Sequence, residues 1–253
     1  METTLTLGDV EVARIGLGTN RLRDTPENAE FVRLAVAAGV GYVDTAHTYT
    51  DGASERTIGA ASPGPEVVVG TKGGFAPGTG SPEQLRAQVD ESLRRLRVES
   101  ISLYYLHRVD PETPLEESLA ALAECREAGK IRHVGLSHVD VEQIERAREV
   151  VPIAAVQNHY NLAERRYEGV VDHCQAEGIV FVPYFPLRDD GGRPVDEIAQ
   201  RHGATPAQVS LAWLLSRSPA MLPIPGSLSI EHVRENLAAL ELELSSDELE
   251  ALR

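Results

Sequence analysis

The sequence predicts an α/β fold in which a (β/α)8 TIM barrel follows an N-terminal β-hairpin, and it predicts one domain over residues 1–253. Apolar segments with the length of strands alternate eight times with segments of helical periodicity, which is the pattern of a parallel sheet covered by helices. The strand segments are almost continuously apolar, as in strands that are buried on both faces. A chain of 253 residues has the usual size of a single barrel, and no repeat, linker or low-complexity tract divides it.

The elements can be assigned in order along the chain. Residues 5–12, LTLGDVEV, are typical of a hairpin with Gly8-Asp9 at its turn. Ser81 and Gln84 have the spacing of a capping box, and Asp140 is the expected cap of its helix. We expect strands at residues 12–19, 42–44, 67–71, 101–106, 133–136, 154–156, 179–182 and 221–224. We expect helices at residues 27–38, 81–96, 114–128, 140–150, 167–177, 195–201, 205–215 and 230–240, and a last one that starts near 245.

An open, doubly wound sheet that binds a dinucleotide is the main alternative to a barrel. Such a fold places the fingerprint GxGxxG between its first strand and the following helix. Residues 16–21 read GLGTNR, so they supply the first two glycines and have arginine at the third position. The fingerprint is therefore absent, which favours the barrel.

Composition excludes several classes of partner. The chain has 39 Asp and Glu against 24 Lys and Arg, a net charge of −15, and such a surface would repel a nucleic-acid backbone. No apolar run approaches the ~18 residues of a membrane span, and the N-terminus lacks the basic and apolar regions of a signal peptide. Cys125 and Cys174 lie in helical segments outside any CxxC motif, as is typical of free thiols in a reducing compartment. We expect a cytoplasmic monomer with no nucleic-acid or membrane partner.

Four polar side chains follow successive predicted strands. Asp44 ends the second strand and Tyr49 lies in the loop behind it, while Lys72 and His107 follow the third and fourth strands. Each residue type also has a structural use, as a helix cap, in an ion pair or in one buried hydrogen bond. Barrel enzymes, however, keep their reactive groups at the carboxyl ends of the strands, so the convergence of all four on one rim indicates a catalytic site.

The four residues suit proton transfer to a carbonyl oxygen. A free tyrosine titrates near ~10, and the ammonium group of Lys72 would lower the pKa of Tyr49 by favouring the phenolate. Asp44 would keep Lys72 charged and in place. His107 could orient the C=O group of a substrate and share the path of the proton.

Seven motifs resemble, in the same order, the signatures of the aldo-keto reductase superfamily. They read YVDTAHTY with Glu55 following, VVVGTKGG, LYYLHRVD, GKIRHVGLSHV, AAVQNHYN, VPYFPL and LPIPGSLSIEHVRENLAAL, and they span residues 15–240. The resemblance implies that Asp44, Tyr49, Lys72 and His107 are a catalytic tetrad with Tyr49 as general acid. It also implies reversible, NADPH-dependent reduction of aldehydes and ketones to alcohols, with the cofactor bound in an extended form without a Rossmann domain.

The resemblance further implies a set of cofactor-binding residues. Ser137, His138 and Gln157 correspond to groups at the nicotinamide carboxamide, and Tyr184 corresponds to the aromatic residue that stacks on the nicotinamide ring. The rest of the set comprises Pro186 and Leu187 at the pyrophosphate, Gly226, Ser227, Ser229, His232, Glu235 and Asn236 around the adenosine 2′-phosphate and adenine, and Gly18, Thr19 and Asn20.

The sequence departs from the family pattern in this set. His138 stands where the family usually has Asn, and an imidazole replaces only one of the two amide hydrogen bonds. With a pKa near ~6.5, protonation of His138 would weaken NADP⁺ binding as the pH falls. Gly226 and His232 stand where the family often has Arg or Lys, so NADH use is possible beside NADPH. Ser229 has two interpretations, a phosphate ligand at a helix start or an ordinary N-cap.

The loops around the expected site are short. Residues 73–80 separate Lys72 from the next helix, and residues 188–192 lead from VPYFPL almost directly into another. The chain ends at Arg253, without the C-terminal tail that often closes the substrate pocket in the family. We therefore expect a shallow, open site with few substrate-specific contacts.

Two other functions were weighed against this one. A metal-dependent barrel hydrolase would use histidines near strand ends, but such enzymes generally have an HxH pair on the first strand, where this chain reads RIGLG. We therefore expect no metal. A non-catalytic, NADP(H)-binding regulatory subunit of the same fold remains open, because an intact tetrad does not guarantee turnover.

Overall fold

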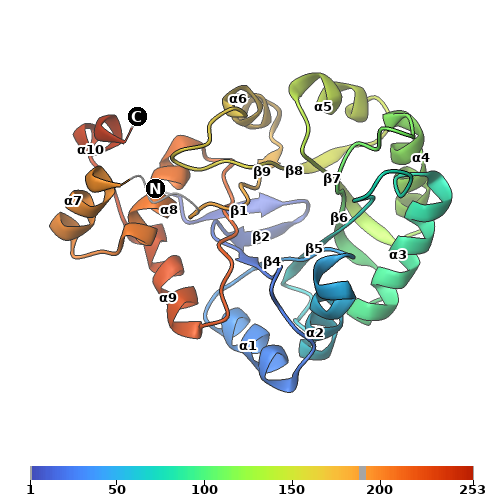
Figure 1. Ribbon diagram of the computed structural model, residues 1–253, viewed down its shortest axis with the longest axis horizontal. Coiled ribbons are helices and arrows are strands. Elements are labelled where there is room, and N and C mark those ends of the chain that lie inside the picture. The colour runs from blue at the N-terminus through green and yellow to red at the C-terminus, as the bar shows by residue number, and fades with distance from the viewer. Residues whose placement is uncertain (1, 188–191, 253) are drawn as a thin grey trace.

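The barrel predicted from the sequence is confirmed by the structure, a computed structural model that describes residues 2–187 and 192–252 (Figure 1). Seven parallel strands of the described chain form one sheet in sequential order, and helices surround it. The strands are β3 (Leu17–Gly18), β4 (Tyr42–Asp44), β5 (Val68–Gly73), β6 (Ile101–Leu106), β7 (Ile131–Ser137), β8 (Ile153–Gln157) and β9 (Val180–Phe181). The helices are α1 (Pro26–Ala37), α2 (Ala53–Ala61), α3 (Pro82–Leu96), α4 (Leu115–Glu127), α5 (Val141–Arg148), α6 (Glu168–Glu177), α7 (Arg193–His202), α8 (Pro206–Arg217), α9 (Ile230–Ala238) and α10 (Ser246–Ala251).

The expected eighth strand at residues 221–224 is instead an extended segment with isolated bridges. It closes the ring nevertheless, because it bonds to both edges of the sheet. The N–H of Leu222 donates to the carbonyl of Phe181 on β9 at 2.9 Å, and the N–H of Gly16, just before β3, donates to the carbonyl of Pro223 at 2.9 Å. Proline has no N–H to donate, so Pro223 prevents a regular ladder here.

The expected strand at residues 12–19 is divided between two elements. The hairpin strands β1 (Thr4–Leu7) and β2 (Val10–Ala13) pair antiparallel as predicted, and the barrel strand β3 begins only at Leu17. Between them the buried side chain of Arg14 donates hydrogen bonds to the carbonyls of Leu215 at 2.9 Å and Ser218 at 2.5 Å. The buried guanidinium group thus satisfies carbonyls at the C-terminal end of α8 and fixes the segment between the hairpin and the barrel.

Two layers of apolar packing hold the fold together. The larger layer lies between the sheet and its helices. The smaller layer fills the barrel and includes Leu7 and Val12 of the hairpin together with Tyr42 and Tyr105 of the strands. The hairpin, at the centre of the ring in Figure 1, therefore plugs the barrel at the end opposite the strand carboxyl termini.

The helix boundaries agree with the prediction to within a few residues, with two differences. Helix α2 was not predicted, because its buried positions include the polar residues Ser54, Glu55 and Thr57, which hide the apolar periodicity. Ser81 precedes α3, but its side chain makes no capping hydrogen bond, so the expected capping box is wrong. Asp140 does cap α5, in a capping box with Gln143. The expected short connection at residues 188–191, and Arg253, lie outside the described residues.

Candidate active site

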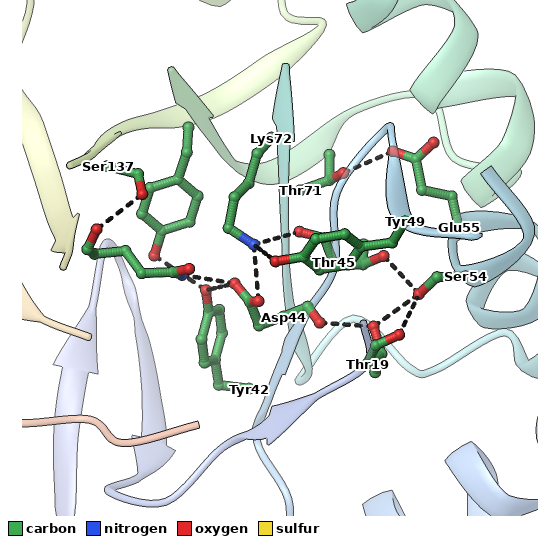
Figure 2. A network of polar contacts seen from close by, with 12 residues as sticks. Thr19, Tyr42, Asp44, Thr45, Tyr49, Ser54, Glu55, Thr71, Lys72 and Ser137 are labelled. Carbon is green, nitrogen blue, oxygen red and sulfur yellow. Dashed lines mark hydrogen bonds and ion pairs between the residues drawn. The ribbon is translucent and has the colours of Figure 1, made fainter. Parts of the chain in front are cut away.

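The structure brings the four predicted catalytic residues together at the carboxyl end of the barrel, and Figure 2 shows Asp44, Tyr49 and Lys72 among them. The Nζ atom of Lys72 lies 2.8 Å from Oδ2 of Asp44 and 3.4 Å from the hydroxyl oxygen of Tyr49, and it also donates to the carbonyl of Thr45 at 2.6 Å. The side chains of Lys72 and Asp44 are 0% and 2% exposed, so this ion pair is shielded from water. The ring of His107 lies edge-on to that of Tyr49, with 6.2 Å between their centroids.

The backbone after β4 places Tyr49 above Lys72. The N–H of His47 donates to the carbonyl of Lys72 at 2.9 Å, and the N–H of Tyr49 donates to the carbonyl of Ala46 at 3.1 Å. The chain then passes through Thr50 and Asp51 in the left-handed region, with φ of 47° and 52°. Non-glycine residues rarely adopt this region, so the backbone of the turn that positions the phenol is strained.

A buried ion pair on the outer side of the barrel supports the same loop. Arg95 on α3 donates from Nη1 to the carbonyl of His47 at 2.9 Å and to Glu55 at 3.2 Å. Glu55, which is fully buried, also accepts a hydrogen bond from the hydroxyl of Thr71 at 2.6 Å. These contacts tie α2, α3 and β5 to the Tyr49 loop, and they give Glu55, which follows the YVDTAHTY motif, a positioning role.

The charges of the site differ in one respect from the expectation. Burial lowers the pKa of Lys72, but the carboxylate of Asp44 and the phenol of Tyr49 outweigh burial and raise it, so the ammonium stays charged. Burial raises the pKa of Tyr49 above its ordinary value, and Lys72 opposes this only in part. The expected lowering of the Tyr49 pKa is therefore wrong, because loss of solvation exceeds the attraction of the neighbouring cation. Tyr49 is a protonated donor at neutral pH.

His107 is a neutral imidazole. Burial lowers its pKa to about 2, and the positive charge of Lys72 acts in the same direction. Its Nδ1 atom is buried and has no hydrogen-bond partner among the described residues. A neutral imidazole carries one N–H and one acceptor nitrogen, so His107 can donate one hydrogen bond to a ligand.

Asp44 also connects the tetrad to the predicted nicotinamide wall. Its Oδ1 atom accepts hydrogen bonds from Nε2 of Gln157 at 2.7 Å and from the hydroxyl of Tyr42 at 3.2 Å. The hydroxyl of Ser137 donates to the backbone carbonyl of Gln157 at 2.8 Å. The ends of β4, β7 and β8 are thus joined by one hydrogen-bonded network (Figure 2).

A cavity of about 670 Å³ opens over this network. Its volume suits an extended organic ligand rather than a single ion. Of the predicted residues it is lined by Gly18, Thr19, Asn20, Asp44, Tyr49, His107, Ser137, His138, Gln157, Tyr184, Pro186, Leu187 and Gly226. Lys72 lies beneath the cavity floor. Ser227, Ser229, His232, Glu235 and Asn236 lie outside its lining, on the loop and helix that follow Gly226.

The aromatic side of the cavity is formed by stacked rings. His159 lies parallel to Tyr184, with centroids 5.2 Å apart and an interplanar angle of 14°. His138 approaches the same tyrosine, and its Nδ1 is 3.3 Å from the hydroxyl oxygen of Tyr184. Burial lowers the pKa of His138 to about 4, with Arg108 and His159 adding to the effect. The expected titration of His138 near 6.5 is therefore wrong, because a half-buried imidazole among cations is held neutral.

The residues after Gly226 are partly occupied by contacts within the protein. The hydroxyl of Ser229 accepts a hydrogen bond from the N–H of His232 at 3.3 Å, so Ser229 is the N-cap of α9. Glu235 accepts a hydrogen bond from the hydroxyl of Thr205 at 2.7 Å. The side chain of His232 is exposed in the first turn of α9. An N-cap leaves other N–H groups of the first turn available, so capping and anion binding are compatible at this helix.

Several lining residues were missed by the sequence analysis. They are Arg21, Phe75, Arg108, Phe185, Ile224 and Pro225. Arg21 lies beside Gly226 and contacts its carbonyl oxygen at 3.4 Å. The cavity therefore has a permanent cation at the end where this chain has Gly226 and His232 in place of the family's Arg or Lys. Arg21 and Arg108 each lie two residues after the end of an expected strand, and that position is the signal in the sequence that points to them.

The described residues contain neither a metal-binding cluster nor a membrane-spanning helix. No group of three or more His, Cys, Asp or Glu side chains is placed to hold a metal ion. No helix within residues 2–187 and 192–252 is long and apolar enough to cross a membrane.

Comparison with known proteins agrees with this geometry. A model of the Aldo/keto reductase family matches residues 14–253. Pyridoxine 4-dehydrogenase of Escherichia coli is 35% identical over 98% of this chain and 96% of its own length. Aldo-keto reductase yakc [NADP(+)] of Schizosaccharomyces pombe is 32% identical over 99% and 90%.

Solved structures are similar over almost the whole chain. An aldo/keto reductase from Klebsiella pneumoniae in complex with NADP and acetate has a TM-score of 0.89 and 31% identity, and the match covers 100% of this chain and 94% of that one. A thermostable aldo-keto reductase in complex with the inhibitor epalrestat has a TM-score of 0.92 and 34% identity, with 99% and 98% covered.

Proposed function

Because the chain belongs to the aldo/keto reductase family, we propose that it catalyses the NADPH-dependent reduction of aldehydes and ketones to alcohols, with Tyr49 as the general acid. The observation that carries this proposal is the position of the Lys72 ammonium, 2.8 Å from the Asp44 carboxylate and 3.4 Å from the Tyr49 hydroxyl. A buried cation beside a phenol stabilises the negative charge that the phenol acquires when it gives up its proton.

The residues of the cavity fit an extended dinucleotide. The tyrosine ring of Tyr184 lies at one end and the cation Arg21 at the other, beside Gly226. A Cβ atom at Gly226 would meet no atom closer than 3.5 Å, so the backbone there is open to a ligand. The E. coli and S. pombe relatives are named as a dehydrogenase and an NADP(+) enzyme, which supports NADPH as the cofactor. Bound NADPH would supply the hydride that the carbonyl carbon accepts.

The protein's own part of the reaction is to hold the carbonyl oxygen and deliver a proton to it. Two donors face the same end of the cavity, the phenol of Tyr49 and the neutral imidazole of His107. Because burial raises the pKa of Tyr49, the phenol keeps its proton until charge develops on the substrate oxygen. Lys72 then stabilises the phenolate, and Asp44 keeps Lys72 in place. In the direction of alcohol oxidation the same groups act in reverse.

Steady-state oxidation of NADPH in the presence of simple aldehydes tests this proposal. The panel includes pyridoxal because the E. coli relative is named for pyridoxine. We expect turnover of at least one aldehyde and a higher kcat/KM for NADPH than for NADH, since Arg21 can pair with a phosphate. NADPH binding without turnover of any aldehyde would instead indicate a non-catalytic, cofactor-binding regulatory subunit.

A further inference from the structure

Arg108 is a cation at the cavity wall that pairs with no acidic side chain among the described residues. It follows His107 at the end of β6, lines the cavity and is exposed. Its guanidinium group lies over the ring of Phe75, 5.0 Å from the centroid. Within residues 2–187 and 192–252 it takes part in no ion pair or hydrogen bond, although the chain has 39 Asp and Glu residues. An arginine that no described acidic side chain neutralises is available to bind an anion.

The loop that carries Arg108 is held in place by hydrogen bonds to the neighbouring loop. Asp110 accepts hydrogen bonds from the N–H of Gly78 at 3.0 Å and the N–H of Gly80 at 2.8 Å, so the loop after β6 is fastened to the loop after β5. Phe75 on the latter loop packs against His107, with 4.8 Å between ring centroids. The guanidinium group is therefore held by a flat apolar surface that continues to a residue of the tetrad.

The charge of Arg108 reaches into the cavity. Burial is the main cause of the lowered pKa of His107 and of His138, and Arg108 adds to it at both residues. These imidazoles lie on two walls of the same cavity. Arg21, the other arginine among the described lining residues, lies instead beside Gly226. The two cations thus serve different parts of the cavity, with Arg108 next to the reacting end.

We propose that Arg108 determines substrate specificity by binding a carboxylate on the substrate, so that the preferred substrates are aldehydes that join a carboxylate to a flat apolar body. This inference rests on the proposed reductase function. A guanidinium group binds a carboxylate through two parallel N–H donors, and the ring of Phe75 would contact the apolar body. The general surface, with its net charge of −15, repels anions, so selection for a carboxylate must come from such a local cation.

The test compares para-carboxybenzaldehyde with its neutral methyl ester, methyl para-formylbenzoate. For the wild type we expect a higher kcat/KM for the acid than for the ester. In Arg108→Gln we expect kcat/KM for the acid to fall ~10–100-fold, mainly through KM, and that for the ester to change little. Arg108→Lys, which keeps the charge but loses the paired donors, should fall between them. Arg86→Gln on α3 removes the same charge far from the cavity and should leave the ratio unchanged.

Two outcomes would overturn the proposal. In the first, the wild type has no higher kcat/KM for the acid than for the ester. In the second, Arg108→Gln lowers kcat/KM for both substrates and the affinity for NADPH alike, so that Arg108 serves the cofactor or the fold instead. Calorimetric binding of para-(hydroxymethyl)benzoate to the complex with NADP⁺ separates this from failure of the proposed function. A wild type that reduces neither aldehyde but binds this anion more tightly than Arg108→Gln would refute the reductase and keep the carboxylate site. Equal binding by both proteins would refute the site itself.

Discussion

Gln157 donates a hydrogen bond from Nε2 to Oδ1 of Asp44 at 2.7 Å. The same carboxylate receives the ammonium group of Lys72 on its other oxygen at 2.8 Å. Asp44 therefore links Lys72, which supports proton transfer, with Gln157 on the wall where we place the nicotinamide. Because one N–H of its amide is committed to Asp44, Gln157 can offer a ligand only its second N–H and its carbonyl oxygen.

Replacing Gln157 by leucine should lower the free energy of unfolding of the cofactor-free protein. Gln157→Leu removes a hydrogen bond to a buried carboxylate, which is worth roughly 1.5–3 kcal/mol. Urea unfolding at neutral pH should show a loss of that size. Gln175→Leu, at an exposed position on α6, is the matched control and should change the free energy of unfolding by less than about 0.5 kcal/mol. Equal unfolding curves for the two variants would show that the Gln157–Asp44 bond contributes nothing to the fold.

His138 should make no contribution to the pH dependence of NADP⁺ binding near neutrality. Its pKa is lowered to about 4, so the imidazole is neutral throughout the range from about pH 5.5 to pH 8. Cofactor affinity measured by fluorescence quenching should be the same function of pH in the wild type and in His138→Asn. A transition near pH 6.5 that is present in the wild type and absent from the variant would mean that the imidazole titrates normally.

The raised pKa of Tyr49 predicts that kcat depends differently on pH in the two directions of the reaction. Reduction needs the protonated phenol, so its kcat should stay constant from about pH 6 to about pH 9, below the ordinary tyrosine value of ~10. Oxidation of the alcohol needs a phenolate to accept the proton, so its kcat should rise through the same range. A decline of the reduction rate centred near pH 8 would show that Lys72 outweighs burial after all.

The sequence predicted the barrel well because its signal is local and repeated. Apolar strands and amphipathic helices alternate at short intervals, and each can be recognised without its neighbours. The errors arose where tertiary contacts override that signal. Pro223 interrupts the ladder of the closing strand. The buried Glu55 of α2 looks exposed in sequence because its partner Arg95 is 40 positions away.

The site was predicted less completely than the fold. Strand ends and family motifs located the tetrad, and the structure places all four residues together. Two pKa expectations failed, those of Tyr49 and His138, because burial cannot be read from residue types. Arg108 was overlooked because an arginine beside a strand end looks like any surface cation. That no acidic side chain within residues 2–187 and 192–252 pairs with it is visible only in the folded structure.

The most direct measurement of the proposed function is the turnover of Tyr49→Phe with NADPH and an aldehyde that the wild type reduces. The substitution removes the proton donor but keeps the ring above Lys72, which lies 4.8 Å from its centroid. NADPH affinity should therefore stay within about twofold of the wild type, while kcat should fall by ~10²–10⁴-fold, the contribution of a general acid. A variant that binds NADPH normally and retains more than about a tenth of the wild-type kcat would contradict the assignment of Tyr49 as the acid.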